Sequence, residues 1–151
     1  MTVYFDMDGT IADLYGVPGW LLKLIANDPS PYTQAKPLVN MSLLARRIHQ
    51  LEKQNVKFGI ISWLPKGSNP AYDQAVTQAK LKWLKTHLPS VTFAEIHILP
   101  YGTPKSSVVD KAFFNILFDD ESDNRKEWLQ NIRCLAYHES AIFGAMKNML
   151  L

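Results

Sequence analysis

Short apolar runs alternate with helix-forming patterns along the whole chain. The runs with the composition of β-strands are Val3–Asp6, Lys57–Ile61, Thr92–Leu99, Asn115–Phe118 and Arg133–Ala136. All but one are short and apolar, which is typical of strands buried on both faces of a parallel sheet, and the more mixed run Thr92–Leu99 is expected nearer an edge. Because strands and helices alternate, we predict an α/β fold: a Rossmann-like three-layer sandwich with a mainly parallel five-stranded sheet.

Apolar stripes at steps of three and four residues predict the helices. The stripes are Met41, Leu44, Ile48 and Leu51; Tyr72, Val76, Ala79 and Trp83; and Ile142, Met146 and Met149. Asn40 precedes the first stripe, and Asn69 with Pro70 precedes the second, as residues that begin helices do. We therefore expect helices that start at these asparagines and pack their stripes on the sheet.

Three lysines occur within the second of these helices. Lys80, Lys82 and Lys85 lie mainly off its apolar stripe. A basic rail for an acidic substrate is one interpretation, but long lysine side chains on a helix usually extend into solvent. We therefore expect a solvated helix face.

The segment Gly16–Pro37 differs from the rest, since it carries four prolines and only one short helical run, Trp20–Ala26. We interpret it as a small cap insertion within a single domain that spans residues 1–151. Its position after a pair of acidic residues would suit a lid over a site. An ordinary surface loop with a helix would have the same composition.

The overall composition limits the classes of protein that the chain can represent. With 151 residues, 47% of them hydrophobic and 20% charged, it suits one globular domain without a membrane span. A net charge of +2 predicts no strong nucleic-acid-binding surface. The single cysteine, Cys134, excludes an internal disulfide framework, and we expect no secretory signal, so we predict a cytoplasmic protein.

Two acids, Asp6 and Asp8, follow the first apolar run in the stretch VYFDMDGTIADLY. An EF-hand calcium loop also spaces acids two apart, but it needs a third ligand before its glycine and flanking helices. A receiver domain has its acidic pair near the start, whereas Asp119 and Asp120 come late. Groups beyond the carboxyl ends of parallel strands converge on one crevice, so we expect Asp6, Ser62 and Asp119 to meet there.

Four motifs in order resemble those of the haloacid dehalogenase (HAD) superfamily, which consists mostly of Mg-dependent phosphatases. They are FDMDGT at Phe5–Thr10, GIIS ending at Ser62, TPKSSVVD containing Lys105, and NILFDD ending at Asp119 and Asp120. The resemblance covers nearly the whole chain, with Gly16–Pro37 in the place of the family's cap. It implies a Mg-dependent phosphomonoesterase that works through an aspartyl-phosphate intermediate.

The resemblance also implies a catalytic role for one residue or more of each motif. Asp6 would be the nucleophile, and Asp8 would protonate the leaving oxygen and later take a proton from water. Ser62 would donate a hydrogen bond to a phosphoryl oxygen. Lys105 would bind phosphoryl oxygens and balance the charge of Asp6, because its ammonium group is a compact positive charge.

Closely packed carboxylates require a compensating cation. Two of them about 4 Å apart at an effective dielectric of about 20 repel each other by roughly 4 kcal/mol. Mg²⁺ suits such a site because it accepts a few carboxylates and bridges to phosphate. The resemblance makes Asp6 and Asp119 side-chain ligands of the metal and the backbone carbonyl of Asp8 a third. Asp120 would be an outer or alternative ligand, or a hydrogen-bonding partner for the loop or for Lys105.

Two residues at the end of the first motif and one acid after the last motif also need an interpretation. Gly9 and Thr10 are expected to shape the turn after the first strand, so that backbone N–H groups approach the phosphate of the substrate. Asp123 precedes a short helical pattern through Leu129, and we favour helix capping over metal binding for it.

Within the superfamily, DMDGTIADLY, KSSVVD and FDDESDNRKEW most resemble the 5'(3')-deoxyribonucleotidase-like branch. That likeness implies a small phosphorylated metabolite, such as a nucleotide, as the substrate. Gly16–Pro37 is shorter than the cap of those nucleotidases, so base recognition is not carried over residue by residue. Aromatic side chains would stack on a base, close a pocket or pack in the core: Trp20, Tyr32, Trp63 and Tyr101.

Two other functions stay open on the same residues. One is a phosphate-ligand sensor or interaction module with little turnover, and the other is a phosphotransferase on the same scaffold. A small cap would also leave the site open to a bulkier phosphorylated substrate, or to closure by another subunit in a homo-oligomer.

Overall fold

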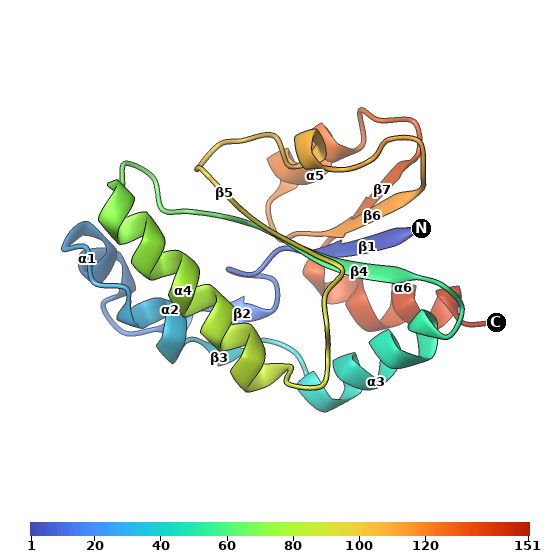
Figure 1. The fold of residues 1–151 in the computed structure, drawn as a ribbon, viewed down its shortest axis with the longest axis horizontal. Coiled ribbons are helices and arrows are strands. Elements are labelled where there is room, and N and C mark those ends of the chain that lie inside the picture. Colours follow the sequence, from blue (N-terminus) through green and yellow to red (C-terminus); the bar gives the residue numbers. More distant parts are fainter.

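The computed structural model describes residues 1–151, and its centre is a five-stranded parallel sheet (Figure 1). The strand order is β5-β4-β1-β6-β7. The strands are β1 (Thr2–Phe5), β4 (Lys57–Trp63), β5 (Glu95–Leu99), β6 (Asn115–Phe118) and β7 (Cys134–Tyr137). The predicted α/β fold with a parallel five-stranded sheet is confirmed, and the mixed run that was expected near an edge forms the edge strand β5.

Helical segments cover both faces of this sheet. Alternate strand positions point to opposite faces, so Val3 and Phe5 of β1 pack on one side and Tyr4 packs on the other. The first side is covered by α3 (Met41–Glu52), α4 (Pro70–His87) and α6 (Ile142–Met149). The second side carries α5 (Ser122–Trp128) and the 3₁₀ turn η2 (Lys105–Val108), with Trp128 packed edge-on against Tyr4. The molecule is therefore a three-layer sandwich.

The two longest helices begin at the predicted asparagines. Oδ1 of Asn40 accepts a hydrogen bond from the N–H of Leu43, and Oδ1 of Asn69 accepts one from the N–H of Tyr72, each at 2.9 Å. These bonds satisfy N–H groups that the first helical turn leaves without a partner. None of the helices combines the length and the apolar character that crossing a membrane requires.

The prediction for Asp123 is wrong in detail. Glu121 occupies the N-cap position of α5, and Asp123 lies in the first turn without a side-chain capping bond. Its negative charge still lies near the helix N-terminus, where the unpaired N–H groups favour an acid.

The segment between β1 and α3 forms a compact insertion (Ala12–Pro37). Two short antiparallel strands close its base, and three helical segments lie between them: β2 (Ala12–Asp13), η1 (Leu14–Gly16), α1 (Trp20–Ile25), α2 (Ser30–Gln34) and β3 (Lys36–Pro37). The expected helical run from Trp20 is observed as α1. The sequence pattern does not predict α2, because it is one short turn that begins with prolines.

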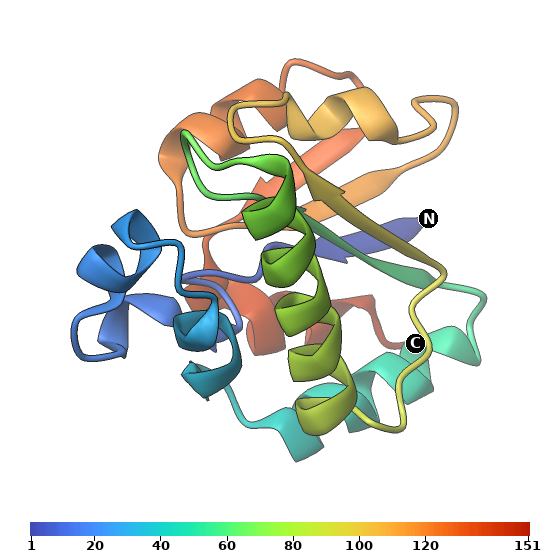
Figure 2. The same cartoon turned by 60° about the vertical axis from the view of Figure 1, so that its left-hand side comes forward.

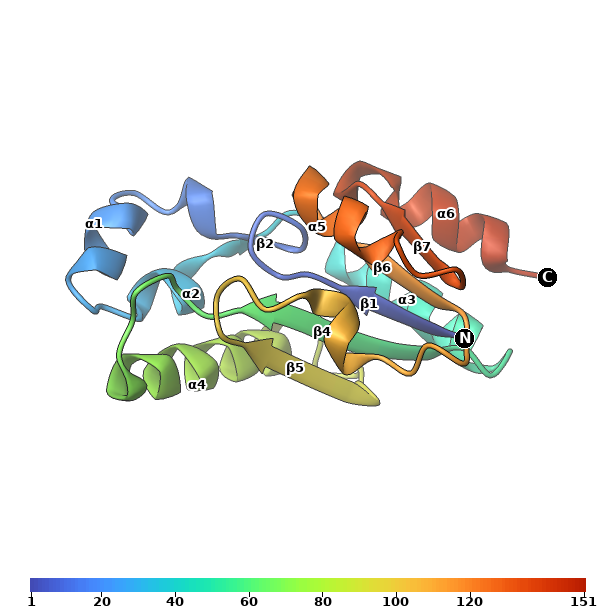
Figure 3. The same ribbon diagram turned by 90° about the horizontal axis from the view of Figure 1, so that it is seen from above.

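The insertion lies beyond the carboxyl ends of β1 and β4 and beside α4 (Figures 2 and 3). Tyr32 of α2 packs in one apolar cluster with Tyr72 and Val76 of α4. In addition, Nε1 of Trp83 donates a hydrogen bond to the carbonyl oxygen of Ala35 at 2.7 Å. The insertion is therefore packed against the core rather than held by its two connections alone.

One of the three lysines of α4 contradicts the expectation of a solvated face. Lys82 and Lys85 are exposed, but Lys80 retains only 1% of its accessible surface. Lys80 follows Val76 by four residues and precedes Trp83 by three, so it continues the buried stripe of the helix. The placement of Lys80 off that stripe was therefore wrong.

Candidate active site

Lys105 joins two acids that come from neighbouring strands. Asp6 follows β1 directly and Asp119 follows β6. The Nζ atom of Lys105 donates hydrogen bonds to Oδ1 of Asp6 at 2.9 Å and to Oδ2 of Asp119 at 2.7 Å, and all three side chains are buried. Burial lowers the pKa of Lys105, but the two carboxylates outweigh that effect and hold its pKa above the usual value. The lysine therefore stays charged between the acids.

The turn after β1 holds Asp120 beside Asp6. The hydroxyl of Thr10 lies 3.0 Å from Oδ2 of Asp6 and 3.2 Å from Oδ1 of Asp120, and it accepts a hydrogen bond from the N–H of Asp120. Gly9 has a φ angle of +82°, and a Cβ atom there would lie 2.4 Å from Oδ2 of Asp120. Only glycine allows the turn to approach this acid so closely.

Gly9 and Thr10 thus shape the turn as expected, but their N–H groups are engaged within it. The N–H of Gly9 donates to the carbonyl of Ala12, and that of Thr10 donates to the carbonyl of Met7. Contact of Gly9 or Thr10 with a substrate phosphate stays a prediction.

Three carboxylates form a cluster that fits a divalent cation. Oxygens of Asp6, Asp119 and Asp120 lie within 4.8 Å of one another. Burial, followed by repulsion from Asp6, raises the pKa of Asp119 to about 6 and that of Asp120 to about 7. These raised pKa values show that one lysine does not balance the cluster. An all-oxygen donor set with excess negative charge suits Mg²⁺.

Asp8 points to a different partner. Its Oδ2 accepts a hydrogen bond from Nζ of Lys80 at 2.9 Å, and its side chain is not among the clustered acids. Burial raises the pKa of Asp8 above its ordinary value, which the nearby charge of Lys80 opposes and that of Asp6 reinforces. The two acids of the DMDG motif therefore have different environments, and each is paired with its own lysine.

Ser62 lies deeper than its expected role requires. Its side chain is fully buried, it is not among the residues that line the adjacent pocket, and its Oγ accepts a hydrogen bond from Lys80 at 2.6 Å. The next residue, Trp63, does line the pocket, with its Nε1 donating to the carbonyl of Thr103. Contact between Ser62 and a phosphoryl oxygen stays a prediction, and the buried position of Ser62 gives it no direct support.

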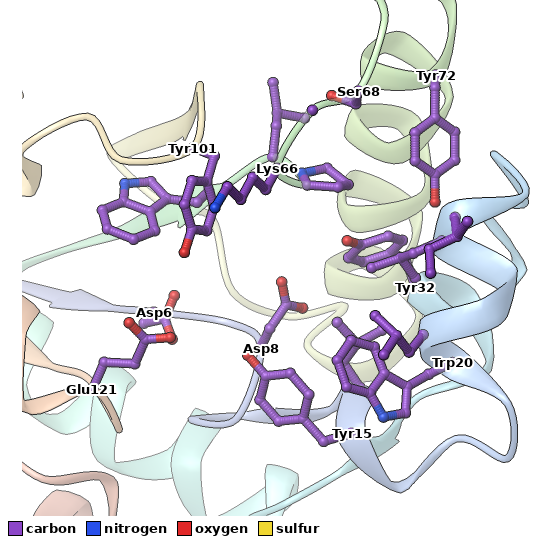
Figure 4. Close-up of a pocket in the computed structure, with 18 of the residues that line it drawn as sticks. Asp6, Asp8, Tyr15, Trp20, Tyr32, Lys66, Ser68, Tyr72, Tyr101 and Glu121 are labelled. Atoms are coloured by element: carbon purple, nitrogen blue, oxygen red, sulfur yellow. The ribbon is translucent and has the colours of Figure 1, made fainter.

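A pocket of about 570 Å³ opens beside these charged residues (Figure 4). Asp6, Asp8 and Lys105 lie at its polar end. Aromatic and aliphatic side chains form most of the remaining wall, from the insertion, α4 and the loops after β4 and β5: Leu14, Tyr15, Trp20, Leu21, Leu24, Ile25, Tyr32, Trp63, Leu64, Tyr72 and Tyr101. The volume is within the range of small-molecule sites, and the mixture of an apolar wall with a few charged groups is typical of them.

Several residues that line the pocket are not predicted by the sequence motifs. Tyr15, Lys66 and Glu121 line the pocket, and Asn124 both lines it and donates a hydrogen bond to Oδ2 of Asp119 at 3.1 Å. Asn124 follows the acidic pair at a distance of five and four residues, so one helical turn returns it to the acids. That spacing was a usable signal, whereas the pocket position of Lys66 depends on how the loops fold together.

Known structures resemble this fold, although neither a protein-family model nor a curated protein matches the sequence. A chain of a solved Pnkp1/Rnl/Hen1 complex superposes with a TM-score of 0.59 and 16% identity, over 91% of this chain and 44% of that chain. The chain thus spans less than half the length of that protein. The HAD domain of effector protein Lem4 from Legionella pneumophila superposes less well, with a TM-score of 0.42 and 16% identity over 97% and 93%. At these identities the likeness concerns the fold alone.

The charge of the carboxylate cluster predicts that Mg²⁺ stabilises the folded chain. At about 100 times its dissociation constant, the ion would add about 2.7 kcal/mol to the free energy of unfolding, or about 5–10 °C in Tm for a chain of this size. The raised pKa values mean that folding favours protonated Asp119 and Asp120 below pH 6–7, so stability is lost as the pH rises through these values. Thermal unfolding at pH 5 and pH 8 should therefore show the larger Mg²⁺ effect at pH 8.

Asp119→Asn removes one ligand and should abolish most of that rise in Tm. Asp123→Asn is the matched control, because this exposed acid in the first turn of α5, four residues after Asp119, lies outside the cluster, and it should retain the Mg²⁺ effect. An equal rise in both variants would place the ion elsewhere.

Proposed function

We propose that the chain is a Mg-dependent phosphomonoesterase of the HAD type. The observation that carries this proposal is the Lys105 bridge between Asp6 and Asp119, two acids that are distant in the sequence. This arrangement provides a carboxylate nucleophile, a cation beside it and a carboxylate cluster for a metal at the end of one pocket. The ordered motifs and the α/β fold support the same function.

In the first step, an oxygen of Asp6 attacks the phosphorus of the bound ester, and the bond from phosphorus to the leaving oxygen breaks. Asp8 transfers its proton to that oxygen, so an alcohol leaves and an aspartyl-phosphate remains on Asp6. Burial raises the pKa of Asp8, which is the direction that favours a proton donor over an ionised carboxylate.

In the second step, Asp8 takes a proton from water, and the water oxygen attacks phosphorus. The bond to Asp6 breaks, inorganic phosphate leaves, and both carboxyl groups return to their starting states. Lys105 stabilises the negative charge on Asp6 and on the phosphoryl oxygens during both steps. Mg²⁺ held by Asp6, Asp119 and the Asp8 carbonyl, with Asp120 nearby, would neutralise phosphoryl charge and align the ester.

A nucleoside monophosphate is the substrate that we propose within this class. The pocket beside the charged end is lined by aromatic rings on both sides, including the pair Trp63 and Tyr101, whose ring centres are 5.1 Å apart, and Tyr32 and Trp20 opposite (Figure 4). Flat nucleobases stack on such rings. A sugar phosphate would instead require hydrogen-bonding groups along this apolar wall.

Asp6→Asn should abolish phosphate release, because an amide does not form the acyl phosphate. Loss of a nucleophile costs on the order of 1,000-fold or more in kcat. Released phosphate should be measured on a panel of nucleotides, sugar phosphates and phosphorylated polynucleotide ends, with Mg²⁺ and with a chelator. Asp123→Asn is the control and should retain activity.

Hydrolysis by Asp6→Asn at the normal rate, or hydrolysis that chelation does not change, would refute this mechanism. Binding of a phosphate analogue without turnover across the panel would favour the sensor alternative. An added acceptor alcohol that becomes phosphorylated would favour phosphoryl transfer.

Tyr101→Ala should weaken nucleotide binding through the loss of one stacking surface. Base stacking on an aromatic ring contributes about 1–3 kcal/mol, so KM for a nucleoside monophosphate should rise about tenfold, while KM for glycerol 2-phosphate should change less than about twofold. Phe113→Ala, an exposed aromatic residue outside the pocket, is the control. Equal changes in KM for both substrates would argue against a base-binding role for this wall.

A further inference from the structure

Lys80 is a buried cation for which the resemblance assigns no role. Only 1% of its surface is accessible, and its ammonium group uses all three donors: Oδ2 of Asp8 at 2.9 Å, Oγ of Ser62 at 2.6 Å and the carbonyl oxygen of Trp63 at 2.7 Å. The ring of Tyr32 lies 5.1 Å from Nζ. Through these contacts Lys80 connects α4 with the turn after β1, with the end of β4 and with the insertion.

Packing alone does not explain a lysine at this position. Removing an ammonium group from water costs several kcal/mol, and an apolar residue of similar volume is often equally stable or more so. The rest of the α4 stripe follows the apolar rule, with Val76, Ala79 and Trp83 buried beside Lys80. Lys80 is the exception to this rule, and it lies at the point where the helix contacts Asp8.

The contacts of Lys80 divide the Asp8 carboxyl group into two different oxygens. Oδ2 is bound by the lysine, whereas Oδ1 accepts no hydrogen bond, and Asp8 lines the pocket. The hydroxyl of Ser62 makes no hydrogen bond other than the one that it accepts from Lys80, and the lysine is further fixed by the Trp63 carbonyl. A carboxyl group held at one oxygen by a residue that is itself held twice has little freedom to rotate.

We propose that Lys80 is a positioning residue, anchored by Ser62 and the Trp63 carbonyl, that holds Oδ2 of Asp8 so that Oδ1 faces the leaving oxygen of the ester. This inference rests on the proposed phosphomonoesterase function. It also reassigns Ser62, which acts through Lys80 rather than by touching the phosphoryl group. Lys105 and Lys80 therefore serve different acids: one serves the nucleophile and the other the proton donor.

The test compares two phosphate esters whose leaving groups differ in whether they need a proton. p-Nitrophenyl phosphate releases a stable phenolate without a proton, whereas glycerol 2-phosphate releases an alkoxide that needs one. The ratio kcat/KM covers binding through departure of the leaving group, so it reports the step in which Asp8 is the acid. Lys80→Met should lower kcat/KM for glycerol 2-phosphate by about 10- to 100-fold, since general acid catalysis contributes about 100- to 10,000-fold, and for p-nitrophenyl phosphate by less than about threefold.

Ser62→Ala is the second variant, because it keeps Lys80 and removes one anchor. It should show the same selective loss in a weaker form, and the double variant should lose less than the product of the two single losses, since both act through one contact. Lys82→Met, on the exposed face of the same helix, is the control and should behave like the native chain with both esters. Thermal unfolding of each variant verifies that it is folded, so that the kinetic constants of folded chains are compared.

The outcomes separate this inference from the proposed function. If the native chain hydrolyses both esters and Lys80→Met lowers kcat/KM for both by the same factor, Lys80 has only a structural role and the inference is overturned. If the native chain hydrolyses neither ester with Mg²⁺, the proposed function fails first. If Ser62→Ala raises KM for both esters equally without the selective loss, Ser62 contacts the phosphoryl group and the reassignment is wrong.

Discussion

The burial of several carboxyl groups beside one another is the constraint on which the rest of the site depends. Asp6, Asp119 and Asp120 have oxygens within 4.8 Å of one another, and Lys105 is the only basic side chain that forms ion pairs with them. Removing one partner from such a buried set leaves uncompensated charge, which typically costs about 3–5 kcal/mol. The acids stay close together because they directly follow two neighbouring strands, whose ladder hydrogen bonds hold the backbone in place. The excess negative charge of this cluster fits a divalent cation.

Topology explains why residues so distant in sequence form this cluster. The central position of β1, between β4 and β6, places the turn after Asp6 next to the ends of both neighbours. Asp119 enters from one neighbour, and Ser62 and Trp63 enter from the other. The insertion leaves the chain at the same end of the sheet, so that its apolar helices form a wall over the acids instead of a separate domain. Charge and apolar surface thus meet at one edge of the fold.

Sequence alone predicts the parts of this structure that depend on local patterns. The parallel strands were found from apolar runs, and the starts of α3 and α4 from Asn40 and Asn69, because caps and periodicity are local properties. The meeting of Asp6 with Asp119 followed from the general rule for strand ends. Lys80 was misplaced, although it stands four residues after Val76, because residue type suggested solvent more strongly than spacing suggested burial. Its partners Asp8 and Ser62 lie 72 and 18 residues away, and no local pattern encodes that contact.

Two carboxyl groups separated by one residue can have different tasks only if their surroundings differ. Asp6 lies in the strongly charged cluster with Lys105 and the other acids, where the proposed mechanism places the attacking oxygen. Asp8 lies on the far side of the turn, where burial raises its pKa and Lys80 binds one oxygen while leaving the other open to the pocket. In a continuing strand Asp6 and Asp8 would point to the same face, so it is the turn after β1 that directs them to different lysines. Each acid is also paired with its own lysine, so the short DMDG turn offers the two different environments that the proposed attacking group and proton donor require.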